Sequence, residues 1–138
     1  MEKSFTALSI ADIAALNKNA LKDFGGFFSE LDKNFHNKES LQYTLEACIF
    51  PLFGKAIYPT IHEKISAIVQ TIICGHVFHD GNKRTALSVA VALYEENGYI
   101  FSPTKADEDF FVRIATDNLT VEEICTWLKE RVRPLPCW

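Results

Sequence analysis

The sequence predicts an all-α fold, a single domain over residues 1–138 with about six helices around a central buried helix. Helix-start signals carry this prediction, because Ser or Thr stands three positions before an acidic residue at Ser9, Thr60, Thr104 and Thr120. Apolar residues recur at steps of three and four after these starts. Segments that alternate between apolar and polar residues are short, so strands have a minor share.

The first half of the chain holds three expected helices. One begins after Ser9 and ends at Gly25-Gly26, and a weaker one covers residues 40–50 and is ended by Pro51. A third follows Thr60, and its apolar stripe leads to His76. Its members are Ile61, Ile65, Ile68 and Ile72.

The second half holds the remaining helices. Residues 82–97, closed by Gly98, have almost no polar face, which is typical of a buried hub helix. One helix follows Thr104, and another runs from Thr120 through Ile124, Leu128 and Val132 until Pro134 stops it. Short strands are possible near Phe5–Leu8 and Tyr99–Phe101.

Composition excludes several classes of protein. A chain that is 48% hydrophobic can fold without disulfides or a structural metal. Its 14 basic and 18 acidic residues give a net charge of −4, which argues against direct nucleic acid binding or bulk attachment to an anionic membrane. The sequence lacks a secretory signal and a membrane-length apolar run, and three of its four cysteines lie in apolar runs, so we expect a cytoplasmic protein with buried, reduced thiols.

Lys83 and Arg84 stand where cations are unfavourable, in the first turn of the expected helix over residues 82–97. A bound anion would resolve this, because free N–H groups and two cations suit phosphate oxygens. Gly81 would let the backbone approach such a ligand closely. The ordinary alternative is that Asn82 caps the helix and both cations are solvated.

His76 makes the anion site the better interpretation. It should emerge where one core helix ends, five residues before the next begins, and so face the anion site. Asp80 in the connecting loop offers an oxygen ligand for Mg²⁺ held mainly by substrate phosphates. An imidazole, a carboxylate and a phosphate cradle are the parts of a phosphoryl or nucleotidyl transfer site.

The segment His76-Val-Phe-His-Asp80-Gly-Asn-Lys-Arg84 resembles the signature of the Fic/Doc superfamily, and is closest to its death-on-curing (Doc) toxins of type II toxin–antitoxin systems. The resemblance implies that ATP modifies a protein hydroxyl. His76 would be the general base, and Asp80 the Mg²⁺ ligand. Gly81, Asn82, Lys83 and Arg84 would bind phosphate, and Phe78 would anchor the loop by packing.

Two positions distinguish kinase-type from AMP-transferring relatives. Lys83 stands where AMP-transferring Fic proteins carry Gly, and Leu87 stands where they carry a second Arg. The resemblance therefore implies that the γ-phosphate passes to a Thr of translation elongation factor Tu, which stops translation. Gly81 is the Fic-like choice, so AMP transfer stays the alternative. A cognate antitoxin would restrain the enzyme, docking a helix near aromatic pairs that could equally be core, namely Phe27-Phe28, Phe50/Phe53 and Phe110-Phe111.

Two further interpretations are open. Cys74, His76, His79 and Asp80, with His62 upstream, could form the metal cluster of an HD-type phosphohydrolase. The chain could also be an inactive binding module, although a module has no use for the retained base.

Overall fold

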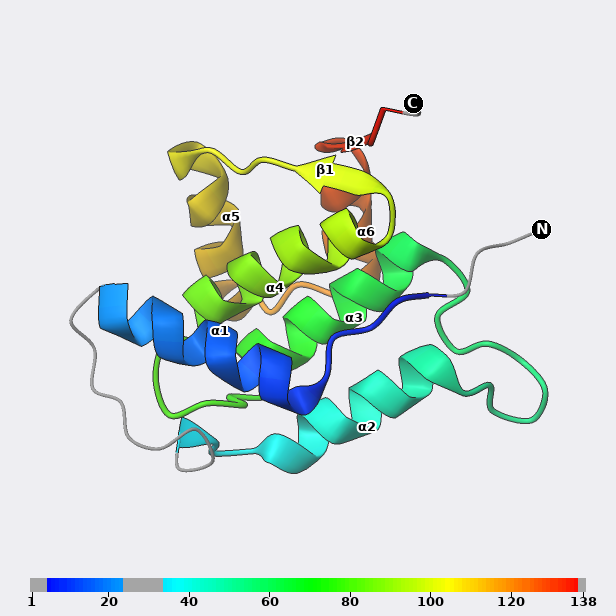
Figure 1. Ribbon diagram of the computed structural model, residues 1–138, viewed down its shortest axis with the longest axis horizontal. Helices are drawn as coiled ribbons and strands as arrows, with labels where there is room; N and C mark the ends of the chain where they lie inside the picture. The colour runs from blue at the N-terminus through cyan, green and yellow to red at the C-terminus, as the bar shows by residue number, and fades with distance from the viewer. Residues whose placement is uncertain (1–4, 24–33, 137–138) are drawn as a thin grey trace.

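The computed structural model describes residues 5–23 and 34–136. Within them lie six helices, as the sequence predicts, and two short strands, of which the sequence predicts only the first (Figure 1). Their bounds are α1 Ile10–Asp23, α2 Lys38–Ile49, α3 Ile61–Cys74, α4 Asn82–Glu96, β1 Tyr99–Phe101, α5 Lys105–Thr116, α6 Val121–Lys129 and β2 Val132–Pro134. The predicted end of α1 at Gly25-Gly26 lies outside the described residues.

The predicted helix caps are confirmed. The side chains of Thr60, Thr104 and Thr120 each accept a hydrogen bond from the backbone N–H three residues on. Ser9 and Asp12 bond reciprocally, at 3.0 and 3.1 Å. These side chains satisfy N–H groups that a helix start would otherwise leave unpaired.

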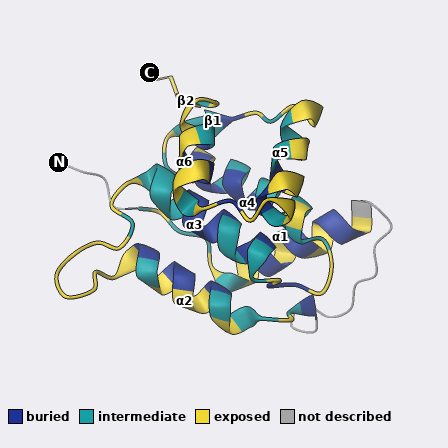
Figure 2. Ribbon diagram, turned by 180° about the vertical axis from the view of Figure 1, so that it is seen from behind, coloured by how far each residue is buried: buried dark blue, intermediate teal, exposed yellow. Residues whose placement is uncertain are grey.

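The centre of the bundle is the pair α3 and α4. Among the described residues, α3 has no exposed side chain, and in α4 only Lys83, Glu95 and Glu96 are exposed (Figure 2). Helix α4 packs on α1, α5 and β1, while α3 packs on α2, α5 and α6. The sequence therefore identified α4 correctly as a hub, and α3 shares that position.

The C-terminal end of α6 differs from the prediction. The helix stops at Lys129, and Val132 begins the strand β2, which pairs antiparallel with β1. Arg133 precedes Pro134, so the α conformation is disfavoured there, and the segment extends alongside Phe101 instead. The predicted strand over Tyr99–Phe101 is confirmed.

The N-terminal strand prediction is wrong within the described residues. Residues 5–9 belong to no helix and join no sheet. Their polar backbone is satisfied by a side chain, because Asn97 Oδ1 accepts from the Thr6 N–H at 2.8 Å and Asn97 Nδ2 donates to the Thr6 carbonyl at 2.9 Å. This amide replaces a neighbouring strand and ties the first residues to the end of α4.

The described cysteines are free thiols. Cys48 and Cys125 are buried and Cys74 is half-buried, in line with the prediction that they are apolar packing residues. Burial raises the pKa of the Cys48 thiol to about 12, so it stays protonated and unreactive. Cys137 lies outside the described residues. None of the described helices has the length and apolar character needed to cross a bilayer.

Candidate active site

The segment between α3 and α4 makes a tight turn immediately after α3. Gly75 caps α3, and a Cβ there would lie 2.5 Å from the Thr71 carbonyl oxygen, so only glycine fits. His76 follows with a φ of 48°, a left-handed conformation that histidine adopts more readily than bulkier residues do. The Phe78 side chain is buried and stacks on Phe35 at 4.8 Å between ring centroids, so its predicted packing role is confirmed.

A short segment ahead of α2 holds the outer side of this loop. The Val77 carbonyl accepts from the backbone N–H groups of His36, at 2.7 Å, and Asn37, at 3.0 Å. The His79 N–H donates to the Asn34 carbonyl at 2.9 Å. The Asn37 side chain reaches the Gly75 carbonyl at 3.0 Å. The motif loop is therefore fixed by residues that lie about 40 positions earlier in the chain.

Asn82 closes the loop from inside. Its Oδ1 accepts from the Phe78 N–H at 2.9 Å, and its Nδ2 donates to the Phe78 carbonyl at 2.8 Å. It is the first residue of α4, whose N-cap is Gly81, in the left-handed conformation with φ 77°. The alternative in which Asn82 caps the helix is thus wrong. Because its side chain is used within the loop, its predicted contact with phosphate would come from its backbone N–H.

Asn17 of α1 supports the loop from the core. Its side chain is fully buried, and Nδ2 donates to the Asp80 carbonyl and to Thr85 Oγ1, both at 3.0 Å. A Cβ on Gly81 would lie 3.4 Å from the same Nδ2 and 3.1 Å from Leu21 Cδ2. Helix α1 therefore fits closely under the turn that begins α4, and sequence patterns alone did not reveal this contact.

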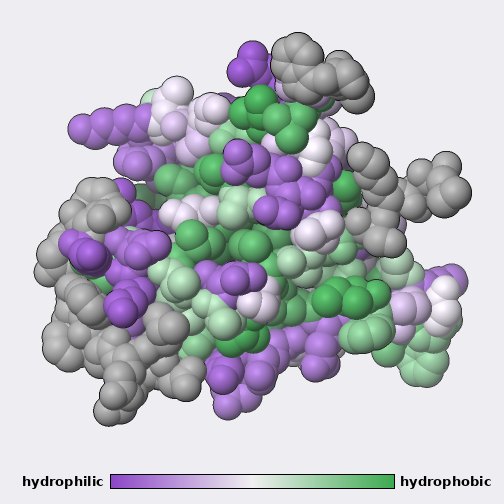
Figure 3. Space-filling model, viewed as in Figure 1, coloured by the Kyte–Doolittle hydropathy of each residue, from purple (hydrophilic) through white to green (hydrophobic). Residues whose placement is uncertain are grey.

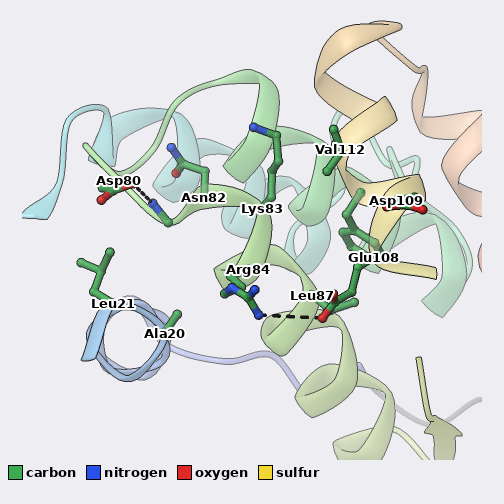
Figure 4. Close-up of a pocket in the computed structure, with 12 residues that line it drawn as sticks. Ala20, Leu21, Asp80, Asn82, Lys83, Arg84, Leu87, Glu108, Asp109 and Val112 are labelled. Carbon is green, nitrogen blue, oxygen red and sulfur yellow. Dashed lines mark hydrogen bonds and ion pairs between the residues drawn. The ribbon is translucent and has the colours of Figure 1, made fainter. Parts of the chain in front are cut away.

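A pocket of about 450 Å³ opens at the start of α4. Five of the predicted site residues line it together, namely Asp80, Gly81, Asn82, Lys83 and Arg84 (Figure 4). The other lining residues are Ala20, Leu21, Leu87, Glu108, Asp109, Phe111 and Val112. Among the described residues His76 is exposed and is not part of this lining, so its role as base stays a prediction.

The electrostatics of the pocket combine two charge signs from two helices. Lys83 and Arg84 occupy the first turn of α4, where N–H groups and the helix dipole also favour an anion. The first turn of α5 places Glu108 opposite, and its Oε1 lies 3.8 Å from Nη1 of Arg84, with both side chains 41% exposed. Figure 4 shows this pair spanning the pocket between the two helices. At this length and exposure the pair contributes little to stability, so a phosphate group can compete for Arg84.

Asp80 is the carboxylate that the motif loop itself contributes to the pocket, and its Oδ1 accepts from the Gly81 N–H at 2.8 Å. The described part of the chain contains no group of three His, Cys, Asp or Glu side chains placed to hold a metal ion. One carboxylate beside a phosphate cradle fits Mg²⁺, which binds few protein ligands and is held largely by phosphate oxygens and water.

The predicted HD-type cluster does not form among the described residues. His62 lies in the first turn of α3, and its Nδ1 is 2.9 Å from the Tyr94 hydroxyl. Cys74, at the other end of α3, lies twelve positions further along the helix, about 18 Å at 1.5 Å per residue. Burial, with the nearby Lys129, lowers the pKa of His62, so this half-buried side chain is neutral at pH 7.

The loop between α3 and α4 lies within a segment of the chain that matches a known protein family. A family model described as Fic/DOC family matches residues 7–94, from just before α1 to the last turn of α4. The chain belongs to the Fic/Doc family. A curated relative, Toxin Doc of Mycolicibacterium smegmatis, is 31% identical over 81 residues, which are 56% of this chain and 62% of that protein. The chain thus aligns with less than two thirds of that Doc toxin's length.

Helix α5 contributes pocket residues that the sequence did not reveal. Glu108, Asp109 and Val112 belong to no recognised motif, and only the packing of α5 beside α4 brings them to the site.

The aromatic pairs suggested for antitoxin docking differ in how exposed they are. Phe111 is buried and Phe110 stacks on Trp127 at 4.0 Å, whereas Phe50 and Phe53 are 64% and 94% exposed. Phe27-Phe28 lies outside the described residues.

Proposed function

We propose that this Fic/Doc protein is a Doc-type toxin that transfers the γ-phosphoryl group of ATP to a protein hydroxyl. The observation that carries the proposal is the pocket in which Asp80, Lys83 and Arg84 meet at the start of α4, where no side chain caps the helix. Cations and N–H groups directed at one place stabilise the charge that develops on a transferring phosphoryl group. By resemblance, the acceptor is a Thr of translation elongation factor Tu.

The proposal gives each site residue a role. Lys83 and Arg84 bind and orient the phosphates, together with the backbone N–H groups that begin α4. Asp80 holds Mg²⁺, which neutralises phosphate charge when bound. His76 accepts the hydroxyl proton as the acceptor oxygen bonds to the γ-phosphorus and the bond from that phosphorus to the bridging oxygen of ADP breaks. Asn17 and Asn82 hold the loop in this arrangement.

The choice of kinase over AMP transferase is supported by Leu87. This apolar side chain lines the pocket at the position where AMP-transferring relatives carry a second Arg. Among the described residues, the basic ones that line the pocket are Lys83 and Arg84, both in the first turn of α4. AMP transfer stays the second candidate because Gly81 is the residue found in those enzymes.

The relative named Toxin Doc supports a toxin role, and with it a cognate antitoxin that neutralises the enzyme. Inhibited growth would follow from modified elongation factor Tu. We propose that the protein acts in the cytoplasm, where this target, ATP and Mg²⁺ occur together.

The deciding experiment incubates the purified chain and a bacterial lysate with ATP labelled at either the α or the γ position. Label from the γ position on one protein band, absent with His76→Ala, is the expected result. Label from the α position on a protein band would show that the enzyme transfers AMP and not the γ-phosphoryl group. With neither label transferred, and with His76→Ala as toxic as the parent chain in cells, the catalytic proposal fails and a binding module remains.

A further inference from the structure

The segment that joins α2 to α3 carries an unusual exposed apolar surface. All nine residues from Ile49 to Ile57, here called the Phe53 loop, are exposed, and seven of the nine are apolar. Five of the eight large apolar side chains exposed in the described residues belong to it, namely Ile49, Phe50, Leu52, Phe53 and Ile57. Monomeric proteins rarely leave so much contiguous apolar surface in water.

The backbone of this loop displays Phe53 at its tip. Leu52 and Lys55 exchange two backbone hydrogen bonds, at 2.8 and 3.0 Å, around a two-residue turn formed by Phe53 and Gly54. Both turn residues have positive φ, 51° and 78°, a pattern that normally selects Asn-Gly. A bulky aromatic residue is disfavoured in that conformation. Phe53 is nevertheless held there with 94% of its surface exposed.

A hollow of about 520 Å³ lies directly beside this turn. Its lining is mostly apolar, formed by Phe5, Ala47, Cys48, Ile49, Phe50, Pro51, Gly54, Ala56 and Lys64. The Lys64 ammonium lies 6.0 Å from the centroid of the Phe5 ring, so a second ring entering the hollow would also meet this cation. Figure 3 shows hydrophobic atoms gathered over the end of α2 and the segment after it.

We infer that the Phe53 loop is a dimer interface, in which Phe53 of each chain enters the hollow of a second copy. A two-fold interface must be self-complementary, and here the projecting ring and the hollow lie side by side on one patch. The five large apolar side chains of the loop are 38% to 94% exposed, so contact with a second copy would remove apolar surface from water on both chains. Glu46, which lies one helical turn before Phe50, and Lys55 in the loop are both exposed and carry opposite charges, so a second copy could pair them across the interface. The inference does not depend on the proposed phosphotransfer.

The test is the molar mass of the full chain, measured by light scattering and sedimentation equilibrium from low-micromolar to sub-millimolar concentration. We expect a monomer–dimer equilibrium that Phe53→Asn shifts at least tenfold toward monomer. Asn fits the turn better than Phe, so thermal stability measured at monomeric concentrations should not fall. Leu135→Asn is the matched control, because Leu135 is exposed outside the loop, and its dimer should be unchanged.

A second pair of variants tests whether a weaker dimer results from loss of the contact between the two copies and not from poor folding of the variant. Glu46→Lys and Lys55→Glu should each weaken the dimer, and the double reversal should restore it. A chain that stays monomeric at every concentration overturns the inference, as does a dimer insensitive to Phe53→Asn. Monomers that sediment with phosphatidylcholine vesicles through Phe53 would overturn it in favour of a membrane surface.

Discussion

The side-chain nitrogen of Asn17 lies 3.0 Å from the carbonyl oxygen of Asp80, a residue 63 positions further along the chain. This contact joins α1 to the loop that leads into the proposed phosphate site. Asn17 Oδ1 is buried with no hydrogen-bond partner in the described part of the chain. A buried polar group that is only half satisfied carries an energetic penalty, and it is retained here where the loop must be held in one conformation.

Replacing Asn17 with Ala should destabilise the fold and also loosen the motif loop. We expect unfolding to become easier by about 2 kcal/mol, because the two hydrogen bonds from Nδ2 are lost in a buried site. Urea unfolding and isothermal titration with ATP·Mg²⁺ measure the two effects. Asn97→Ala is the control, since Asn97 anchors residues at the other end of α4. Equal loss of ATP affinity in both variants would contradict a specific role for Asn17.

Gly81 should tolerate a methyl group less well than Gly98. Both have positive φ, so Ala at either position incurs conformational strain on the order of 1 kcal/mol. At Gly81 the new Cβ would also press on Leu21 at 3.1 Å, whereas at Gly98 nothing lies within 4 Å. Thermal unfolding should therefore show a larger loss for Gly81→Ala, and only that variant should bind ATP more weakly. Identical behaviour of the two variants would show that the close fit of α1 is unimportant.

Lys83→Gly should reduce γ-phosphoryl transfer more than ATP binding. A donor aimed at the transition state is worth on the order of a hundredfold in rate, whereas we expect less than about tenfold in ATP affinity. Single-turnover rates and ATP titration give the two numbers. Lys105→Gly is the control, because Lys105 is exposed in the first turn of α5 and does not line the pocket. Equal transfer rates for Lys83→Gly and the parent would contradict the assigned role.

Protection by ATP should require Mg²⁺. Asp80 lines the pocket beside the place proposed for the phosphates, so the two would repel each other without a bridging cation. With ligand at about a hundred times its Kd, we expect stabilisation of about 2.7 kcal/mol, measured as a shift in thermal unfolding, and little of it once a chelator is added. Asp80→Asn should lose the dependence on Mg²⁺. The same shift with and without chelator would argue against this metal site.

His62 should make the fold sensitive to acid. Burial and Lys129 lower its pKa in the folded chain, so below its ordinary value of 6.5 the unfolded chain binds the proton more readily. Above about pH 6.5, His62 is neutral in both the folded and the unfolded chain, and the free energy of unfolding has its full value. As the pH falls from there toward the lowered pKa, the free energy of unfolding decreases by at most about 1.4 kcal/mol per pH unit. Urea unfolding of the parent and His62→Gln across this range isolates the effect. Parallel pH profiles for the two proteins would contradict it.

Local signals explain why the helices could be predicted, and with them the proximity of the residues proposed to bind phosphate. Caps such as Thr104 act within four residues, and the spacing of Asp80, Lys83 and Arg84 fixes their proximity once a helix begins at Asn82. Contacts between distant segments could not be predicted in this way. The pairing of Val132 with Phe101 and the bond from Asn17 to Asp80 depend on how whole helices pack.

The placement of α5 has a consequence for how proteins with this motif loop can diversify. Its first turn forms the acidic wall of the pocket, yet it lies after residue 94, where the match to the family model ends. Substitutions at Glu108 or Asp109 would alter what approaches the cradle while leaving the motif loop and its supports intact. Two proteins with the same loop could therefore differ in nucleotide or target preference through this helix alone.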